Sequence, residues 1–298
     1  MRHDFKQDHP QAPATRSVAF KIALFALVCA CALIVSLSLG ACTSAQPASE
    51  EQSKAYKTEL MDEGMLKVLT TLDYPPFAAG SAEDAWGYDI AVAHELADRL
   101  GLSLELVPTT RETIIQTLAC KPSPTASEEE TPEPQGDIAI AALAITGERD
   151  EKVDFSDWYY VGNQAVVVRE GVYQSTAEFD PEKTRIAVVK GSTCLETAKT
   201  LTAESLIAEY STAQRCLQAL QAKEVQAVVL DLPVATYLIE NNFAGLRIIE
   251  RIMTGEAYGI AVPSQSPQLK DAINAVLEEM EDDGTLARLQ EEYIGSSY

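Results

Sequence analysis

The sequence predicts an α/β protein whose sheet is covered by helices on both faces. From Leu66 onward, strand-like and helix-like segments alternate along the chain. One segment, residues 137–143, is almost continuously apolar, which is typical of a strand buried on both faces. Glycine or proline follows several of these segments and ends them. Alternating strands and helices of this kind indicate a layered α/β sheet.

The first series of elements begins at residues 66–69, a predicted strand that ends at the prolines of Tyr74-Pro75-Pro76-Phe77. Asp89 is expected to cap a helix, which Gly101 ends. Further strands are expected at residues 102–107 and 137–143, and a short helix at residues 112–118. Residues 120–136 hold four prolines and four glutamates, so we expect an acidic surface loop there.

A second series begins with a predicted strand at residues 185–189. A further strand at residues 227–230 ends at Asp231, and a helix at residues 267–280 carries an apolar stripe and is closed by Gly284. Two pairs match a capping box, in which a hydroxyl and a later Glu or Gln satisfy the helix N-terminus. They are Thr193 with Glu196, and Ser211 with Gln214.

The chain of 298 residues is 46% hydrophobic and carries a net charge of -22. Its length and apolar content suit a globular protein with a substantial core. A surface this acidic repels phosphate backbones, which excludes nucleic-acid binding. It also gives no attraction to an anionic membrane, so any membrane attachment needs another device.

The N-terminus supplies such a device. Residues 22–39 carry no charge and follow a basic leader, as in a secretory signal. Leu39-Gly40-Ala41-Cys42 resembles the lipobox of bacterial lipoproteins, so we expect a signal peptide at 1–41, lipidation of Cys42 and a flexible stalk at 42–62. The alternative is an uncleaved membrane anchor. Either places the remaining chain outside the cytoplasm.

Three cysteines remain after the leader and Cys42: Cys120, Cys194 and Cys216. Whether any two form a disulfide stays open. Only His94 remains among the histidines, and no cysteine spacing suggests zinc. We therefore expect no metal site, no cofactor and no histidine-based catalytic triad.

Several segments, in order, resemble the polar amino-acid-binding proteins of bacterial extracellular solute-binding protein family 3, the capture subunits of ABC importers. Together they span about residues 65 to 295. They are Asp73-Tyr74-Pro75-Pro76-Phe77, Gly87-Tyr88-Asp89-Ile90, Ala144-Ile145-Thr146-Gly147-Glu148-Arg149, Val153-Asp154-Phe155-Ser156-Asp157, Gly191-Ser192-Thr193, Val228-Val229-Leu230-Asp231, Tyr258-Gly259-Ile260-Ala261-Val262 and Asp283-Gly284-Thr285-Leu286.

The resemblance implies a periplasmic-binding-protein-like fold of type II, with two α/β lobes joined by two strands and a ligand cleft between them. The expected first lobe combines residues 63–166 and 257–298, and residues 167–256 form the second. The implied function is capture of a free amino acid by hinge closure and its delivery to a membrane permease and its ATPase. We expect a monomer, held at the membrane by its lipid.

Arg149 is expected to bind the α-carboxylate of the ligand, because it matches the family's carboxylate-binding arginine. A guanidinium meets a carboxylate with two parallel hydrogen bonds. Thr146 and the backbone N–H of Ala144 would add donors. The alternative is a surface arginine paired with an acidic neighbour: Glu148, Asp150 or Glu151.

Asp231 is expected to bind the ligand's ammonium group, since it ends an apolar strand, where α/β sheets present ligand-contacting groups. It could instead cap the following segment. Thr193 suits a carboxylate oxygen or plain helix capping, and Tyr74 would pack against the ligand side chain. Arg111 stands where many relatives carry an aromatic residue. Facing inward it would favour an acidic ligand side chain, and facing outward it would have no such effect.

Two other functions fit the same architecture. One is a dehydratase acting on cyclic precursors of aromatic amino acids, with Asp231 or Glu196 as the acid or base. The other is a ligand-sensing lipoprotein. We favour the binding protein over the dehydratase because no residue spacing marks a catalytic group. We favour it over the sensor because sensors usually carry a transmembrane helix and cytoplasmic domains fused to the lobes, which we do not expect in this sequence.

Overall fold

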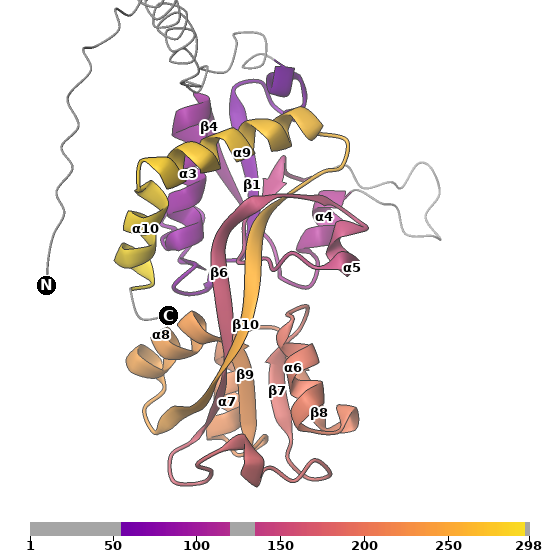
Figure 1. Ribbon diagram of the computed structural model, residues 1–298, viewed down its shortest axis with the longest axis vertical. Coiled ribbons are helices and arrows are strands. Elements are labelled where there is room, and N and C mark those ends of the chain that lie inside the picture. Colours follow the sequence, from indigo (N-terminus) through magenta and orange to yellow (C-terminus); the bar gives the residue numbers. More distant parts are fainter. Residues whose placement is uncertain (1–54, 120–134, 296–298) are drawn as a thin grey trace, which may run out of the picture. The chain divides into compact units, whose positions relative to one another are not determined.

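The computed structural model describes residues 55–119 and 135–295 (Figure 1). The expected signal peptide, Cys42, Cys120 and most of the acidic loop lie outside the described residues. In the two described ranges, no helix combines the length and apolar character that a membrane span requires.

Eight strands form one mixed sheet in the order β4-β1-β5-β10-β6-β9-β7-β8, and β2 pairs with β3 separately. The strands are β1 Met65–Thr70, β2 Asp73–Tyr74, β3 Ala78–Ala79, β4 Ser103–Pro108, β5 Ile138–Ala139, β6 Asp154–Arg169, β7 Ile186–Val189, β8 Ile207–Tyr210, β9 Ala227–Asp231 and β10 Leu246–Val262. The α-helices are α3 Tyr88–Leu100, α4 Ile114–Ala119, α5 Gly147–Asp150, α6 Cys194–Leu201, α7 Ala213–Gln221, α8 Leu232–Asn242, α9 Pro267–Asp282 and α10 Thr285–Tyr293. Short 3-10 helices lie at Tyr56–Thr58, Thr176–Glu178 and Glu204–Leu206.

The two longest strands, β6 and β10, run through both lobes as an antiparallel pair (Figure 1). At one end of this pair, β5 joins β10 through Ala139 and Ala261. At the other end, β9 joins β6 along residues 164–168. The strands β4, β1 and β5 therefore belong to one lobe, and β9, β7 and β8 belong to the other.

The β6–β10 pair is irregular where it passes between the lobes. Its register shifts between Ile252 and Glu256 of β10, opposite Gln164 and Gly162 of β6. An extra residue in one strand bends it and increases its local twist. The bend lies beside the site described below.

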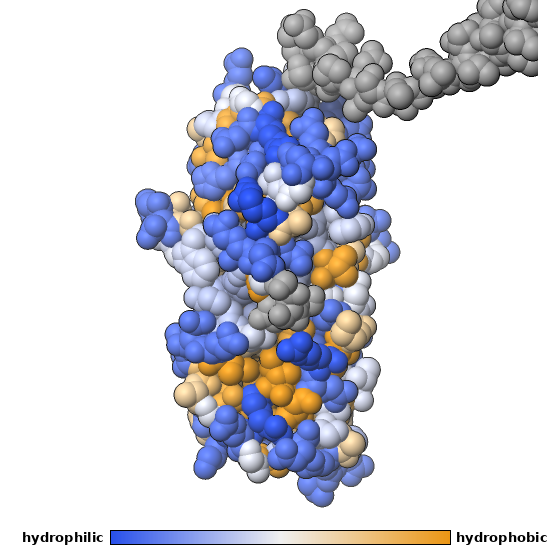
Figure 2. All heavy atoms as spheres, turned by 60° about the vertical axis from the view of Figure 1, so that its left-hand side comes forward, coloured by the Kyte–Doolittle hydropathy of each residue, from blue (hydrophilic) through white to orange (hydrophobic). Residues whose placement is uncertain are grey.

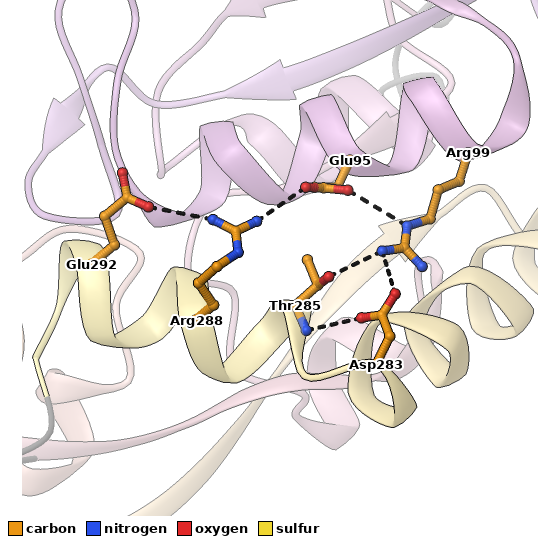
Figure 3. Close-up of polar contacts among 6 residues, drawn as sticks. All are labelled: Glu95, Arg99, Asp283, Thr285, Arg288 and Glu292. Carbon is orange, nitrogen blue, oxygen red and sulfur yellow. Dashed lines mark hydrogen bonds and ion pairs between the residues drawn. The ribbon is translucent and has the colours of Figure 1, made fainter.

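The first lobe is built from both ends of the described chain. The C-terminal helices α9 and α10 lie against α3, and an ion-pair network joins them (Figure 3). Arg99 of α3 donates to Asp283 (2.8 Å) and to Thr285 (3.1 Å), and Glu95 of α3 pairs with Arg288 of α10 at 3.3 Å. The apolar stripe of α9 is buried, as its spacing predicts; its members are Leu269, Ile273, Val276, Leu277 and Met280.

The fold confirms several predicted elements. The helix ended by Gly101 is α3, and Gly101 adopts the left-handed conformation that suits a C-cap (φ 67°). The strands predicted at residues 185–189 and 227–230 are β7 and β9. Helix α10 was not predicted.

Asp89 does not cap α3, contrary to the sequence-based expectation. The N-cap is Gly87, and Asp89 lies within the first helical turn with its side chain fully buried. Its carboxyl accepts hydrogen bonds from the backbone N–H of Ala142 and the hydroxyl of Tyr159, both at 2.7 Å. Burial raises the pKa of Asp89 to about 6, although these two hydrogen bonds oppose the shift.

The apolar run at residues 137–143 is buried as predicted, but only Ile138–Ala139 is strand. The chain then turns, and Ala142 adopts a left-handed backbone conformation (φ 48°). This conformation is costly for a residue with a Cβ. The turn offers the N–H of Ala142 to Asp89 and carbonyl groups to Arg111.

Neither predicted capping box forms. Thr193 is the N-cap of α6, but its hydroxyl makes no capping bond. The N-cap of α7 is Thr212, one residue after Ser211, and its hydroxyl accepts from the N–H of Arg215 at 3.1 Å. A one-residue shift was possible because Ser211 and Thr212 are both good N-cap residues.

The end of the expected stalk packs against the first lobe. Tyr56 is buried and donates to the carbonyl of Leu100 at 2.8 Å. The N–H of Met61 donates to Asp137 at 2.7 Å, and Glu59 accepts from the N–H of Leu269 at 2.8 Å. The flexible stalk expected at 42–62 is therefore wrong from Tyr56 onward.

One face of the protein differs between the lobes in hydropathy. Figure 2 shows hydrophilic residues over most of the upper part, while hydrophobic residues gather in the lower part, on the lobe that carries α8. Val172 and Met253 are exposed hydrophobic residues of this lobe. On this side the second lobe presents the more apolar surface.

Candidate ligand-binding site

A direct hydrogen bond joins the two lobes at Tyr74 and Asp231. Tyr74 ends β2 of the first lobe, and its hydroxyl donates to Oδ2 of Asp231 at 2.7 Å. Asp231 ends β9, is 3% exposed and occupies the N-cap position of α8, but its side chain makes no capping bond. Its carboxylate faces the other lobe instead.

Cys194 approaches the second oxygen of the same carboxylate. Its thiol lies 3.7 Å from Oδ1 of Asp231, and burial, with the charge of Asp231, raises its pKa well above the usual value. Cys194 and Cys216 are both buried free thiols. A thiol held in the protonated form acts here as a weak donor and not as a nucleophile.

Arg149 lies in the short helix α5 and spans the lobes. Its Nη1 donates to the carbonyl of Ala144 at 2.7 Å, and its Nη2 donates to the carbonyl of Gly191 at 2.9 Å. Glu148 pairs with Lys152 instead, so the surface pairing of Arg149 with this neighbour is not what the structure shows. Burial is the main cause that lowers the pKa of Arg149, followed by the charge of Arg111.

The two residues expected to assist Arg149, Thr146 and Ala144, both contact it directly. Thr146 is the N-cap of α5, and its hydroxyl accepts the backbone N–H of Arg149 at 3.3 Å. Ala144 contributes its carbonyl to the Arg149 guanidinium. Both residues fix the position of Arg149, and their expected contacts with a ligand carboxylate stay predictions.

Arg111 faces inward, the orientation in which it would favour an acidic ligand side chain. It is 8% exposed, and its Nη2 and Nη1 donate to the carbonyls of Ala141 (2.8 Å) and Ala142 (3.3 Å). Its guanidinium carbon lies 4.0 Å from the ring centroid of Tyr74, a cation–π contact. Burial alone would lower the pKa of Arg111, but the neighbouring acidic groups, which are Tyr74, Asp231, Tyr258 and Asp89, together outweigh burial, so the pKa is raised.

Two polar residues of the hinge strands belong to the site although they were not predicted. Nε2 of the fully buried Gln164 donates to Thr193 Oγ1 at 3.2 Å and to the carboxylate of Glu256 at 3.1 and 3.2 Å. Burial is the main cause that raises the pKa of Glu256, and the charge of Asp231 adds to it. Gln164 is also the register partner of Asp231.

A sequence signal for these two residues exists but is weak. Gln164 is a polar residue directly before the apolar run of residues 165–168, and Glu256 precedes Tyr258-Gly259-Ile260. A polar residue at a buried position needs a partner. The hydrogen bonds of the folded chain, and not the sequence, identify these partners.

Further contacts close the two lobes onto each other around this site. Lys190 of the second lobe pairs with Glu112 of the first at 2.7 Å, and the rings of Trp86 and Tyr237 lie 5.7 Å apart. The backbone at Gly191 passes so near that a Cβ would lie 3.1 Å from the carbonyl oxygen of Arg111. Across the described ranges, no group of three or more His, Cys, Asp or Glu residues is placed to hold a metal.

The arrangement places charges of both signs between the lobes. Arg149 and Arg111 come from the first lobe, and Asp231 comes from the second. A guanidinium suits a carboxylate, and a carboxylate suits an ammonium group. The site therefore has the chemistry to hold both ends of a zwitterion.

Comparison with known proteins agrees with this chemistry. The chain is 26% identical over 281 residues to the ABC transporter glutamine-binding protein GlnH of Bacillus subtilis (strain 168), covering 92% of this chain and 97% of that protein. An ancestral arginine-binding protein bound to glutamine has a TM-score of 0.69 and 33% identity, covering 79% of this chain and 100% of that one. The ancestral amino acid-binding protein AncCDT-1, a precursor of cyclohexadienyl dehydratase, has a TM-score of 0.67 and 29% identity, covering 78% and 96%.

These neighbours have the two-lobed fold of type II periplasmic binding proteins, as predicted. The family model described as bacterial extracellular solute-binding proteins, family 3, matches residues 66–296, nearly all of the chain beyond the leader. The protein therefore belongs to the bacterial extracellular solute-binding proteins of family 3.

Proposed function

We propose that this protein captures a free α-amino acid between its lobes and delivers it to the permease and ATPase of an ABC importer. Arg149 binds the α-carboxylate, with Thr193, Thr146 and the N–H of Ala144 beside it. Asp231 binds the ammonium group. Tyr74 contacts the ligand side chain, and the ligand stabilises the closed arrangement of the lobes.

One observation carries this proposal: a charged side chain of each lobe forms a hydrogen bond with the other lobe. Arg149 of the first lobe reaches the Gly191 carbonyl of the second. Asp231 of the second lobe accepts from Tyr74 of the first. A zwitterion between these groups adds bonds to both lobes at once, which explains why its binding would favour closure.

A thermal-shift screen of the purified mature domain against the twenty amino acids tests the binding role. A ligand that binds only the folded protein raises its melting temperature by mass action. At least one amino acid should raise the melting temperature in a concentration-dependent way. If none does, the proposed function is wrong.

Arg149→Ala tests the assigned role of the arginine. Its loss leaves a buried carboxylate unpaired, which costs about 2–5 kcal/mol of binding, or about thirty- to several-thousand-fold in affinity. Calorimetric titration of wild type and variant with the best ligand measures the difference. Arg185→Gln, at an exposed residue directly before β7, is the control and should bind like wild type.

The lobe boundaries and the membrane anchor belong to the same proposal. The first lobe comprises residues 63–166 and 257–298, and the second comprises residues 167–256. Cleavage after residue 41 leaves a lipid on Cys42, so the monomeric protein stays on the outer side of the cell membrane. Labelled palmitate should enter the wild type and not Cys42→Ser.

The relationship to AncCDT-1 keeps one enzymatic alternative worth testing. Glu196 is paired with Lys199 on the exposed face of α6, which does not favour it as a catalytic acid. Asp231 is buried beside Tyr74. Incubation with arogenate or prephenate should give no product, and product formation would favour the dehydratase.

A further inference from the structure

The guanidinium of Arg111 stacks on one face of the Tyr74 ring. Its central carbon lies 4.0 Å from the ring centroid, and the residue is 8% exposed. Two backbone carbonyls, of Ala141 and Ala142, accept its terminal N–H groups and hold it there. These contacts therefore hold the Arg111 guanidinium in one position beside Tyr74.

Arg111 is close enough to the binding groups to act on a ligand. Its charge contributes to the lowered pKa of Arg149, after burial, and the charge of Asp231 contributes to the raised pKa of Arg111. Tyr74 lies between Arg111 and Asp231, because it stacks on the first and donates to the second. Since we propose that Tyr74 contacts the ligand side chain, that side chain would lie beside the Arg111 guanidinium.

We propose that Arg111 determines specificity: it favours an α-amino acid with an anionic side chain and rejects one with a cationic side chain. The proposal rests on the proposed function of amino-acid capture. Of the five N–H groups of a guanidinium, the two carbonyl bonds use two, and others can donate to a side-chain carboxylate.

Rejection of arginine and lysine follows from two effects. A ligand cation would meet a like charge in a site of low dielectric, where such contacts are costly. It would also have to stack on an aromatic face that Arg111 already covers. Some relatives are named for arginine binding, and Arg111 predicts that this chain does not share that preference.

Calorimetric titration with glutamate, aspartate, glutamine, arginine and lysine tests the proposal. The wild type should bind glutamate or aspartate at least about 100-fold more tightly than arginine or lysine. Arg111→Met should reduce this ratio by at least about 30-fold, mostly by loss of affinity for the acidic ligand. Arg111→Phe should in addition gain measurable affinity for arginine, since a ring replaces the cation.

The outcomes separate this proposal from the proposed function. A wild type that prefers arginine, lysine or a neutral amino acid to both acidic ones overturns the role of Arg111 and leaves amino-acid capture intact. A wild type that binds no amino acid overturns both. If Arg111→Met fails to fold, the ratio of acidic to basic ligand affinity in the wild type still tests the role of Arg111. Arg111→Lys keeps the positive charge and should keep the preference for acidic ligands. Arg185→Gln should leave the ratio unchanged.

Discussion

The hydroxyl of Tyr74 and the carboxylate of Asp231 lie 157 residues apart in the sequence and 2.7 Å apart in the structure. Their hydrogen bond crosses between the lobes at the site itself. The Arg111 guanidinium stacks on the ring of the same tyrosine. Tyr74 therefore connects the contact between the lobes to the two charged groups that we propose for ligand binding.

Tyr74→Phe should weaken ligand binding by about ten- to a hundredfold. It removes a hydrogen bond to a charged group, worth about 1.5–3 kcal/mol, and keeps the ring. Calorimetric titration with the best ligand measures the loss. Tyr237→Phe is the matched control, because it keeps the ring contact with Trp86 that also joins the lobes. Equal losses in both variants would contradict the role of the Tyr74 hydroxyl.

Gly191→Ala should impair binding beyond its effect on stability. Gly191 has φ 77°, and an added Cβ would lie 3.1 Å from Arg111 O and Glu112 Cα of the opposite lobe. Such crowding costs about 1–3 kcal/mol, or about five- to a hundredfold in affinity.

Gly245→Ala is the control for this experiment, because Gly245 has φ 82° and open space around its Cβ position. Both variants should lose about 1–2 kcal/mol of folding stability from the left-handed backbone. Urea unfolding measures this shared loss, and titration with ligand measures the affinity. Normal affinity in Gly191→Ala would mean that the lobes need not approach this closely.

Asp89 should make the stability of the protein depend on pH. Burial raises its pKa from 3.8 to about 6 in the folded state. Below pH 3.8 the carboxyl is protonated in both states. As the pH rises to 6, the unfolded state releases the proton first, so folding stability falls by about 3 kcal/mol and stays lower above pH 6.

Asp89→Asn isolates this effect, because its amide does not titrate. The free energy of unfolding of wild type minus that of the variant should be largest near pH 4 and should fall by pH 7. Urea unfolding of both proteins at four pH values measures the difference. A difference independent of pH would show that the buried carboxyl is not responsible.

Local patterns predicted the parts of the fold that depend on local chemistry. The stripe on α9 and the end of β9 at Asp231 follow from periodicity and from the change from apolar to polar residues. Asp89 was misread as a capping residue, whereas Thr193 holds the predicted N-cap position of α6 but makes no side-chain capping bond. Each instead uses its side chain on a distant partner: Asp89 on Ala142 and Tyr159, and Thr193 on Gln164.

The site was predictable only where a motif marks it. Arg149, Asp231 and Tyr74 lie in segments that resemble the family, and the structure gathers them between the lobes. Gln164 and Glu256 were missed because a polar residue in a strand is normally solvent-facing. In the paired strands β6 and β10, Gln164 is fully buried and Glu256 is half-buried.

Strands β6 and β10 pass from lobe to lobe without an intervening loop. A ladder of backbone hydrogen bonds resists stretching and shear much more than it resists bending, so relative motion of the lobes has one soft direction. The motion of least resistance is bending of the β6–β10 pair at its register shift between Ile252 and Glu256. In the hinge closure that we propose, opening would then be an elastic deformation that returns each lobe to the same mutual alignment, with Gln164 and Glu256 beside its pivot.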